Sequence, residues 1–174
     1  MSILEILQYP DLRLRRKSHP VTDVKATKIQ KIIETMTDTL LDQESCAGLA
    51  STQLDIGEPP SIVVINPSGN KSQDSILCLI NPQITATEGD TICEEGCMSV
   101  CPTMISARIK RASKINVVAL DIDGNKLEFE AEGFLARCIQ HECDHLQGIL
   151  YIDHLSKLKR AFLDKKIAKL LQTN

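Results

Sequence analysis

Aromatic side chains are scarce in this chain of 174 residues, which has no Trp, two Tyr and three Phe. So few rings argue against a base-stacking platform for single-stranded nucleic acid. Charge of one sign is also lacking, since the formal net charge is only −3. Neither nucleic acid nor an anionic membrane is therefore indicated as the main partner, and we expect no direct DNA binding.

Long apolar runs are absent as well. The longest unbroken run is residues 76–80, far below the roughly 20 residues that a membrane-spanning helix needs. The first residues lack the basic segment and long apolar segment of a secretory signal. We expect a protein with no membrane segment and a cytoplasmic location.

The seven cysteines are odd in number, which argues against a disulfide framework. Cys93, Cys97 and Cys101 are spaced by four residues, unlike the C-x-x-C pairs of structural zinc sites. Cys78 stands in an apolar run and is typical of a small buried side chain. At least some cysteines are therefore expected only to pack.

Hydrophobic periodicity predicts a helix over 24–42, capped by Thr22 or Asp23, and two more helices over 133–147 and 156–172. The predicted strands are 61–65, 76–80, 83–87, 104–109 and the hairpin of 114–121 with 126–130. This order indicates an α+β fold, with mixed or antiparallel strands around the central helix 133–147. We expect one domain over 1–174.

The central helix contains His141-Glu142-Cys143-Asp144-His145, which matches H-E-x-x-H. Residues four apart lie on one face of a helix, so both imidazoles can reach one metal ion. The adjacent Glu142 can then take a proton from a metal-bound water. The other two histidines, His19 and His154, are interpreted as non-ligating.

A catalytic zinc-type site has three protein ligands and one open position, so a third ligand is needed. The candidates are Cys97 upstream, Cys138 on the same helix, and Asp153 or His154 downstream. Asp144 is interpreted as an ion-pair partner, for example of Arg111.

Three segments, in order, resemble the peptide deformylase family. Residues 46–53 resemble G-x-G-x-A-A-x-Q, with Cys46 for the first Gly and Ser51 for the second Ala. Residues 95–99 resemble E-G-C-L-S with Met98 for Leu, and 141–145 match H-E-x-D-H. The resemblance covers essentially the whole chain and favours Cys97 over Cys138 as the third ligand.

The resemblance implies hydrolysis of the N-formyl group on the N-terminal methionine of newly made peptides. It implies a divalent ion, Fe²⁺ with Zn²⁺, Ni²⁺ or Co²⁺ as substitutes, held by Cys97, His141 and His145 with a water as fourth ligand. Glu142 would be general base and then acid, while the Gln53 amide and the Met98 backbone N–H would hold the oxyanion. The expected substrate-binding residues are Gly48, Leu49, Glu95, Phe134 and Cys138.

Departures from the family pattern leave alternatives open. Cys46 would be strained if its backbone had positive φ, and Val100-Cys101-Pro102 lengthens a loop beside the expected cleft. A degenerate deformylase-like protein that binds metal or peptides with little turnover is therefore one alternative. A zinc endopeptidase with a downstream third ligand is another.

The C-terminal segment 155–174 carries six Lys or Arg residues against Asp164 alone. The role of the helix predicted in this segment has two interpretations. The resemblance implies docking on the ribosome, and the other interpretation is a solvated amphipathic helix packed by Leu158, Phe162 and Leu170.

Overall fold

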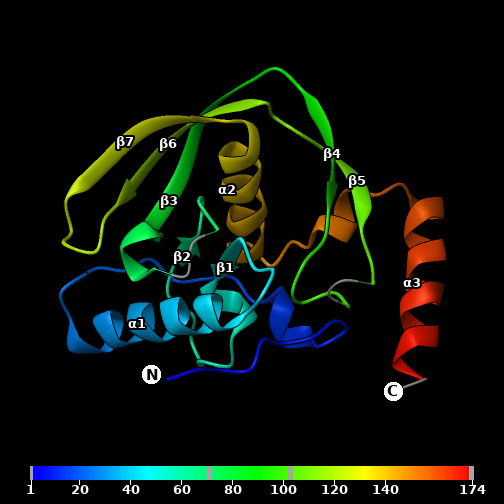
Figure 1. Cartoon of the computed structure of the whole chain (residues 1–174), viewed down its shortest axis with the longest axis horizontal. Coiled ribbons are helices and arrows are strands. Elements are labelled where there is room, and N and C mark those ends of the chain that lie inside the picture. The colour runs from blue at the N-terminus through cyan, green and yellow to red at the C-terminus, as the bar shows by residue number, and fades with distance from the viewer. Residues whose placement is uncertain (1, 70–71, 102–103, 173–174) are drawn as a thin grey trace.

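The computed structural model describes residues 2–69, 72–101 and 104–172. Within these ranges the predicted α+β class is confirmed (Figure 1). The helices are α1 (Thr27–Asp42), α2 (Gly133–Leu146) and α3 (Lys157–Leu171), with short 3-10 turns at Leu12–Arg15, Ser51–Gln53, Gln73–Ser75 and Tyr151–His154. The strands are β1 (Gly48–Ala50), β2 (Ile62–Ile65), β3 (Leu77–Glu88), β4 (Thr91–Glu95), β5 (Ala107–Arg111), β6 (Lys114–Leu120) and β7 (Lys126–Glu132).

The larger sheet is antiparallel, with the order β1-β2-β3-β6-β7, and β4 pairs with β5 in a separate hairpin. Strand β2 is buried on both faces. Since successive side chains of a strand point to opposite faces, Ile62 and Val64 pack into one core cluster and Val63 and Ile65 into another.

Helices α1 and α2 cover opposite faces of this sheet. Ile33, Met36 and Leu40 of α1 belong to the cluster of Ile62 and Val64. Ala136, Ile139 and Leu146 of α2 belong to the cluster of Val63 and Ile65. Figure 1 shows α2 standing between the larger sheet and the β4–β5 hairpin, with α3 at the outer edge. The site-bearing helix is thus held between two β elements.

The predicted break at Asn81-Pro82 is wrong, because β3 runs through it from Leu77 to Glu88. Asn81 has φ 52°, and the register with β6 shifts between Ile80 and Gln83. Its side-chain amide donates to Val21 O and its Oδ1 accepts from Val21 N, both at 2.8 Å. A bulge thus absorbs the proline without ending the strand.

The predicted hairpin of β6 and β7 is confirmed. Strands β1 and β4 had not been predicted, and the strand expected at 104–109 lies at Ala107–Arg111. The N–H groups of Met104 and Ile105 instead donate to Cys101 O in a turn.

The predicted start of the first helix needs correction. Helix α1 begins at Thr27 after Ala26, which offers no side-chain cap, so the predicted cap at Thr22 or Asp23 is wrong. Asp23 accepts from Lys25 N in the turn before the helix.

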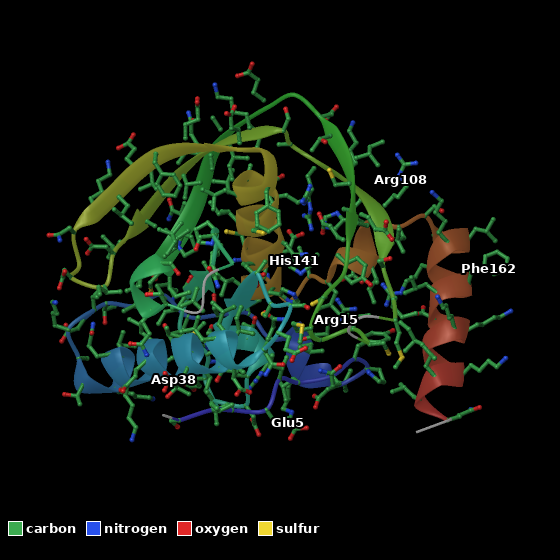
Figure 2. The ribbon with its side chains drawn as sticks, in the orientation of Figure 1. Glu5, Arg15, Asp38, Arg108, His141 and Phe162 are labelled. Carbon is green, nitrogen blue, oxygen red and sulfur yellow. The ribbon has the colours of Figure 1, made fainter. Side chains whose placement is uncertain are left out.

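In α3, Ser156 Oγ accepts from Lys159 N as the cap. The apolar contacts of α3 come from Ile167, with Leu163 and Leu170, whereas the expected Leu158 and Phe162 are 68% and 66% exposed. Figure 2 shows Phe162 pointing outward.

No helix in the described part of the chain is long and apolar enough to cross a membrane.

Candidate active site

Helix α2 brings His141 and His145 together one turn apart, with their Nε2 atoms 3.3 Å from each other. Figure 2 shows His141 near the middle of the molecule. Cys97 follows β4 in a turn closed by the Val100 N–H, which donates to Cys97 O at 3.0 Å. Its Sγ lies 3.2 Å from His145 Nε2. The three ligand atoms all lie within 4.8 Å of one another.

This donor set fits a single metal ion. One sulfur and two imidazole nitrogens suit zinc or iron, and they leave a coordination position open. Burial, with His141 nearby, holds the pKa of His145 well below its usual value, whereas Cys97 and Glu95 outweigh burial at His141 and raise its pKa. Each imidazole has to be neutral at the nitrogen that binds a metal ion. The competing candidates Cys138, Asp153 and His154 lie outside the cluster of Cys97, His141 and His145.

The side-chain amide of Gln53 is fixed on both sides. Its Oε1 accepts from Ala50 N at 2.8 Å, and its Nε2 donates to Ser99 Oγ at 3.1 Å. The same Nε2 lies 3.7 Å from Cys97 Sγ. Because the oxygen is occupied by a backbone donor, the NH₂ end of Gln53 is directed at the cluster.

Glu142 is only 4% exposed. Its Oε2 is one of two buried side-chain N or O atoms without a hydrogen-bond partner in the described part of the chain, the other being His145 Nδ1. Burial raises the pKa of Glu142 to about 7. A buried carboxylate oxygen without a hydrogen bond lowers the stability of the fold unless a ligand or a water molecule donates a hydrogen bond to it.

Gly48 allows Glu142 to occupy this place. A Cβ at Gly48 would lie 2.6 Å from Glu142 Oε1 and 2.9 Å from its Cγ. A side chain at position 48 would overlap with Glu142, so glycine leaves the space that Glu142 occupies.

The outer nitrogen of His141 is held by Glu95. His141 Nδ1 lies 3.0 Å from Glu95 Oε2, and with Nε2 facing the cluster, Nδ1 is the donor. Arg111 donates to both oxygens of Glu95, at 2.9 and 3.0 Å. Burial alone would raise the pKa of Glu95, but the hydrogen bonds from His141 and Arg111 outweigh it and lower the pKa to about 2. Glu95, expected as a substrate contact, is thus engaged with two protein partners.

The predicted ion pair of Asp144 with Arg111 is confirmed at 2.5 Å. Asp144 Oδ2 also lies 2.7 Å from His154 Nε2. His154 therefore lies outside the cluster of Cys97, His141 and His145. It contacts the carboxylate of Asp144, which Arg111 also binds. The chain of contacts from His154 to His141 had not been predicted, because it joins residues that are distant in sequence.

A pocket opens beside the cluster, and among the residues that line it are Gly48, Gln53, Glu95, Met98, Phe134 and Cys138. Leu49 does not line it. Leu49 is fully buried in the core cluster that packs on α1. Alternation along β1 turns Gly48 and Ala50 toward α2 and Leu49 away from it.

Roles for two residues at the site had not been predicted. Ser99 is fully buried and anchors the Gln53 amide. Arg137 lines the pocket one turn before His141. Its spacing of four residues from His141 on the same helix is a signal that would have identified it.

The departures in the first motif are accommodated. Cys46 is absent from the residues with positive φ, and its Sγ donates to Gly48 O at 3.0 Å. Ser51 Oγ donates to Pro60 O. In the unusual loop, Cys101 has φ 43°, and Pro102 lies outside the described residues.

Fold and site together define an α+β protein whose helix-borne histidines and one cysteine form a cluster able to hold a metal ion. The sequence profile described as polypeptide deformylase matches residues 3–161. The chain therefore belongs to the polypeptide deformylase family, which is a family of enzymes.

Proteins named as peptide deformylases are similar to this chain over nearly its whole length. The peptide deformylase of Buchnera aphidicola subsp. Acyrthosiphon pisum is 47% identical over 174 residues, 100% of this chain and 96% of the relative. A crystal structure of a peptide deformylase from Legionella pneumophila has a TM-score of 0.87 at 37% identity, covering 99% of this chain and 97% of the other. The Ehrlichia chaffeensis peptide deformylase in complex with actinonin has a TM-score of 0.83 at 35% identity, covering 97% and 98%.

Proposed function

We propose that this chain, as one domain over 1–174, removes the N-formyl group from the N-terminal methionine of newly made peptides. The observation that carries the proposal is the meeting of three features in one pocket. These are the cluster of Cys97, His141 and His145, the unpartnered carboxylate oxygen of Glu142, and the fixed amide of Gln53.

Cys97, His141 and His145 would hold one divalent ion, with Fe²⁺ expected and Zn²⁺, Ni²⁺ or Co²⁺ as substitutes. When bound, such an ion supplies Lewis-acid polarisation of the carbonyl and lowers the pKa of water. Glu95 would orient the imidazole of His141 through its Nδ1–H.

Glu142 would act as general base and then as general acid. It accepts a proton from the water whose oxygen adds to the formyl carbon. When the C–N bond breaks, it delivers that proton to the leaving nitrogen. The immediate products are formic acid and a peptide with a free amino group, and the formic acid then releases its proton to become formate, so atoms and charge balance.

Gln53 and the backbone N–H of Met98 would donate to the oxygen on which negative charge develops. Preorganised neutral donors are effective because they need no rearrangement during the reaction. The Gln53 amide meets this requirement through its bonds to Ala50 N and Ser99 Oγ.

The pocket wall at Gly48, Phe134 and Cys138 would receive the start of the peptide. The related E. chaffeensis enzyme binds actinonin, and we expect the same molecule to compete with peptide here. Cytoplasmic location follows from the substrate class. The basic helix α3, with Leu158 and Phe162 exposed, is the segment proposed to dock on the ribosome.

The test is release of formate from a formyl-Met tripeptide by anaerobically prepared protein loaded with Fe²⁺. The Glu142→Ala variant, loaded in the same way, is the control for the general base. We expect robust release by the wild type alone. A folded, fully metal-loaded wild type that releases no formate would refute the proposal and favour a degenerate deformylase-like protein.

A further inference from the structure

We propose that Arg137 makes the pocket selective for formylated peptides that carry a carboxylate close to the formylated residue. This inference rests on the proposed function and adds a preference among its substrates.

Arg137 is placed to meet a substrate. It lies on α2 three residues after Phe134 and four before His141, and all three line the same pocket. The guanidinium Cζ lies 5.3 Å from the centroid of the Phe134 ring. A guanidinium stacked on a ring is held in place while its edge N–H groups stay available for hydrogen bonds.

Arg137 has no carboxylate partner among the residues that the structure describes, in contrast to four other arginines. Those four, each within ion-pair distance of an acidic side chain, are Arg13, Arg15, Arg111 and Arg160. A guanidinium matches a carboxylate with two parallel hydrogen bonds, so Arg137 has unused capacity for one.

Two acidic side chains of the pocket wall, Glu94 and Glu95, have other partners. Glu94 accepts a hydrogen bond from the Ser106 hydroxyl, and Glu95 is held by Arg111 and His141. Although Glu94, Glu95 and Glu142 also line the pocket, none of them forms an ion pair with Arg137 in the described part of the chain.

Arg137 does have one polar partner inside the protein, the side chain of Cys93. A hydrogen bond from Thr91, with a further contribution from Arg137, lowers the pKa of Cys93. A thiol hydrogen-bonded in this way is still a weak acceptor beside a carboxylate.

Two parts of a peptide can provide the carboxylate. One is an acidic side chain directly after the formylated methionine, and the other is the C-terminal carboxylate of a formyl dipeptide. Both would be recognised by the same guanidinium fork, and three substrates separate them: formyl-Met-Ala-Ala amide, formyl-Met-Glu-Ala amide and the free acid formyl-Met-Ala.

The experiment measures kcat and KM for the three peptides with the metal-loaded wild type and Arg137→Gln. We expect the wild type to prefer at least one carboxylate peptide by about threefold to tenfold in kcat/KM, mainly through KM, and less at high salt. The ratio between charged and neutral peptide should fall to near one in Arg137→Gln and be partly retained in Arg137→Lys. Lys165→Gln removes an equal charge from α3 and should keep the wild-type ratio.

Calorimetric binding of the same peptides to Glu142→Ala, with and without Arg137→Gln, separates this inference from the proposed function. Turnover without any carboxylate preference, or a preference that survives in Arg137→Gln, overturns the role of Arg137. Selective binding that depends on Arg137 but comes without turnover by the wild type overturns the proposed function and supports this role.

Discussion

Replacing Gly48 by Ala tests how the fold positions the proposed general base. The added Cβ would lie 2.6 Å from Glu142 Oε1, 2.9 Å from its Cγ and 3.0 Å from its Cδ. Gly48 is absent from the positive-φ residues and pairs with Ile65 in the β1–β2 register. The strand itself therefore tolerates Ala, and Glu142 has to give way.

The Glu142 side chain has little room to move, because it is 4% exposed and lies on a helix packed into the core. We expect its carboxylate to move by roughly 1 Å, and a misplacement of that size costs on the order of 10²-fold in rate. Overpacking of this kind also destabilises by about 1–3 kcal/mol. The three atoms nearest to the new methyl group all belong to Glu142, so we expect metal affinity to change little.

The assay compares kcat on a formyl-Met peptide, bound metal per chain and the thermal midpoint. Gly96→Ala is a matched control, since its Cβ would meet Ile105 O at 3.5 Å, an ordinary contact. We expect a much smaller loss of kcat for Gly96→Ala than for Gly48→Ala. A folded, metal-loaded Gly48→Ala enzyme with wild-type kcat would refute the reasoning that glycine is required beside Glu142.

Gln53→Ala should lower kcat by about 10²–10³-fold, as loss of one oxyanion donor does, and an unchanged kcat would remove Gln53 from the mechanism. Glu95→Gln should weaken metal binding by about 10–100-fold in a chelator competition, whereas equal affinity would mean that Glu95 does not orient the ligand. Burial opposes ionisation of Asp153, but hydrogen bonds from Arg15, the Leu150 N–H and Arg160 outweigh it and lower the pKa to about 2 from 3.8. This stabilisation is present above pH 3.8 and lost as pH falls through about 2. The gap in thermal midpoint between wild type and Asp153→Asn should therefore narrow toward pH 2, and a constant gap would contradict the assignment.

Local patterns predicted much of the fold. Periodicity located all three helices of the described residues, and the turn residues Asp123-Gly124 located the β6–β7 hairpin. Strands β1 and β4 were missed because they are short and sit among charged or small residues. The continuity of β3 across Pro82 depends on the amide of Asn81 bonding to Val21, a contact between distant segments that no local pattern contains.

The candidate site divides in the same way. The histidine pair follows from helical spacing, and three ordered motifs supplied Cys97 and Gln53. The direction of Leu49 was missed because it depends on which face of β1 packs against α1. Glu95 was expected to contact substrate, and its bonds to His141 and Arg111 become visible only when β4, β5 and α2 are assembled.

The departures at Cys46 and Ser51 were the reason to consider a degenerate protein, and their surroundings weaken that reason. Strain at Cys46 required a positive φ, which it does not have, and its thiol bonds the carbonyl of Gly48. The extra hydroxyl of Ser51 is buried but has Pro60 O as acceptor, so it leaves no unsatisfied donor. In their presence Gln53 keeps its bonds to Ala50 and Ser99, and Glu142 lies beside Gly48. We therefore expect any difference from other deformylases in the choice of peptide substrate, because Cys46 and Arg137 line the pocket. We expect no difference in the chemistry at Cys97, His141 and His145.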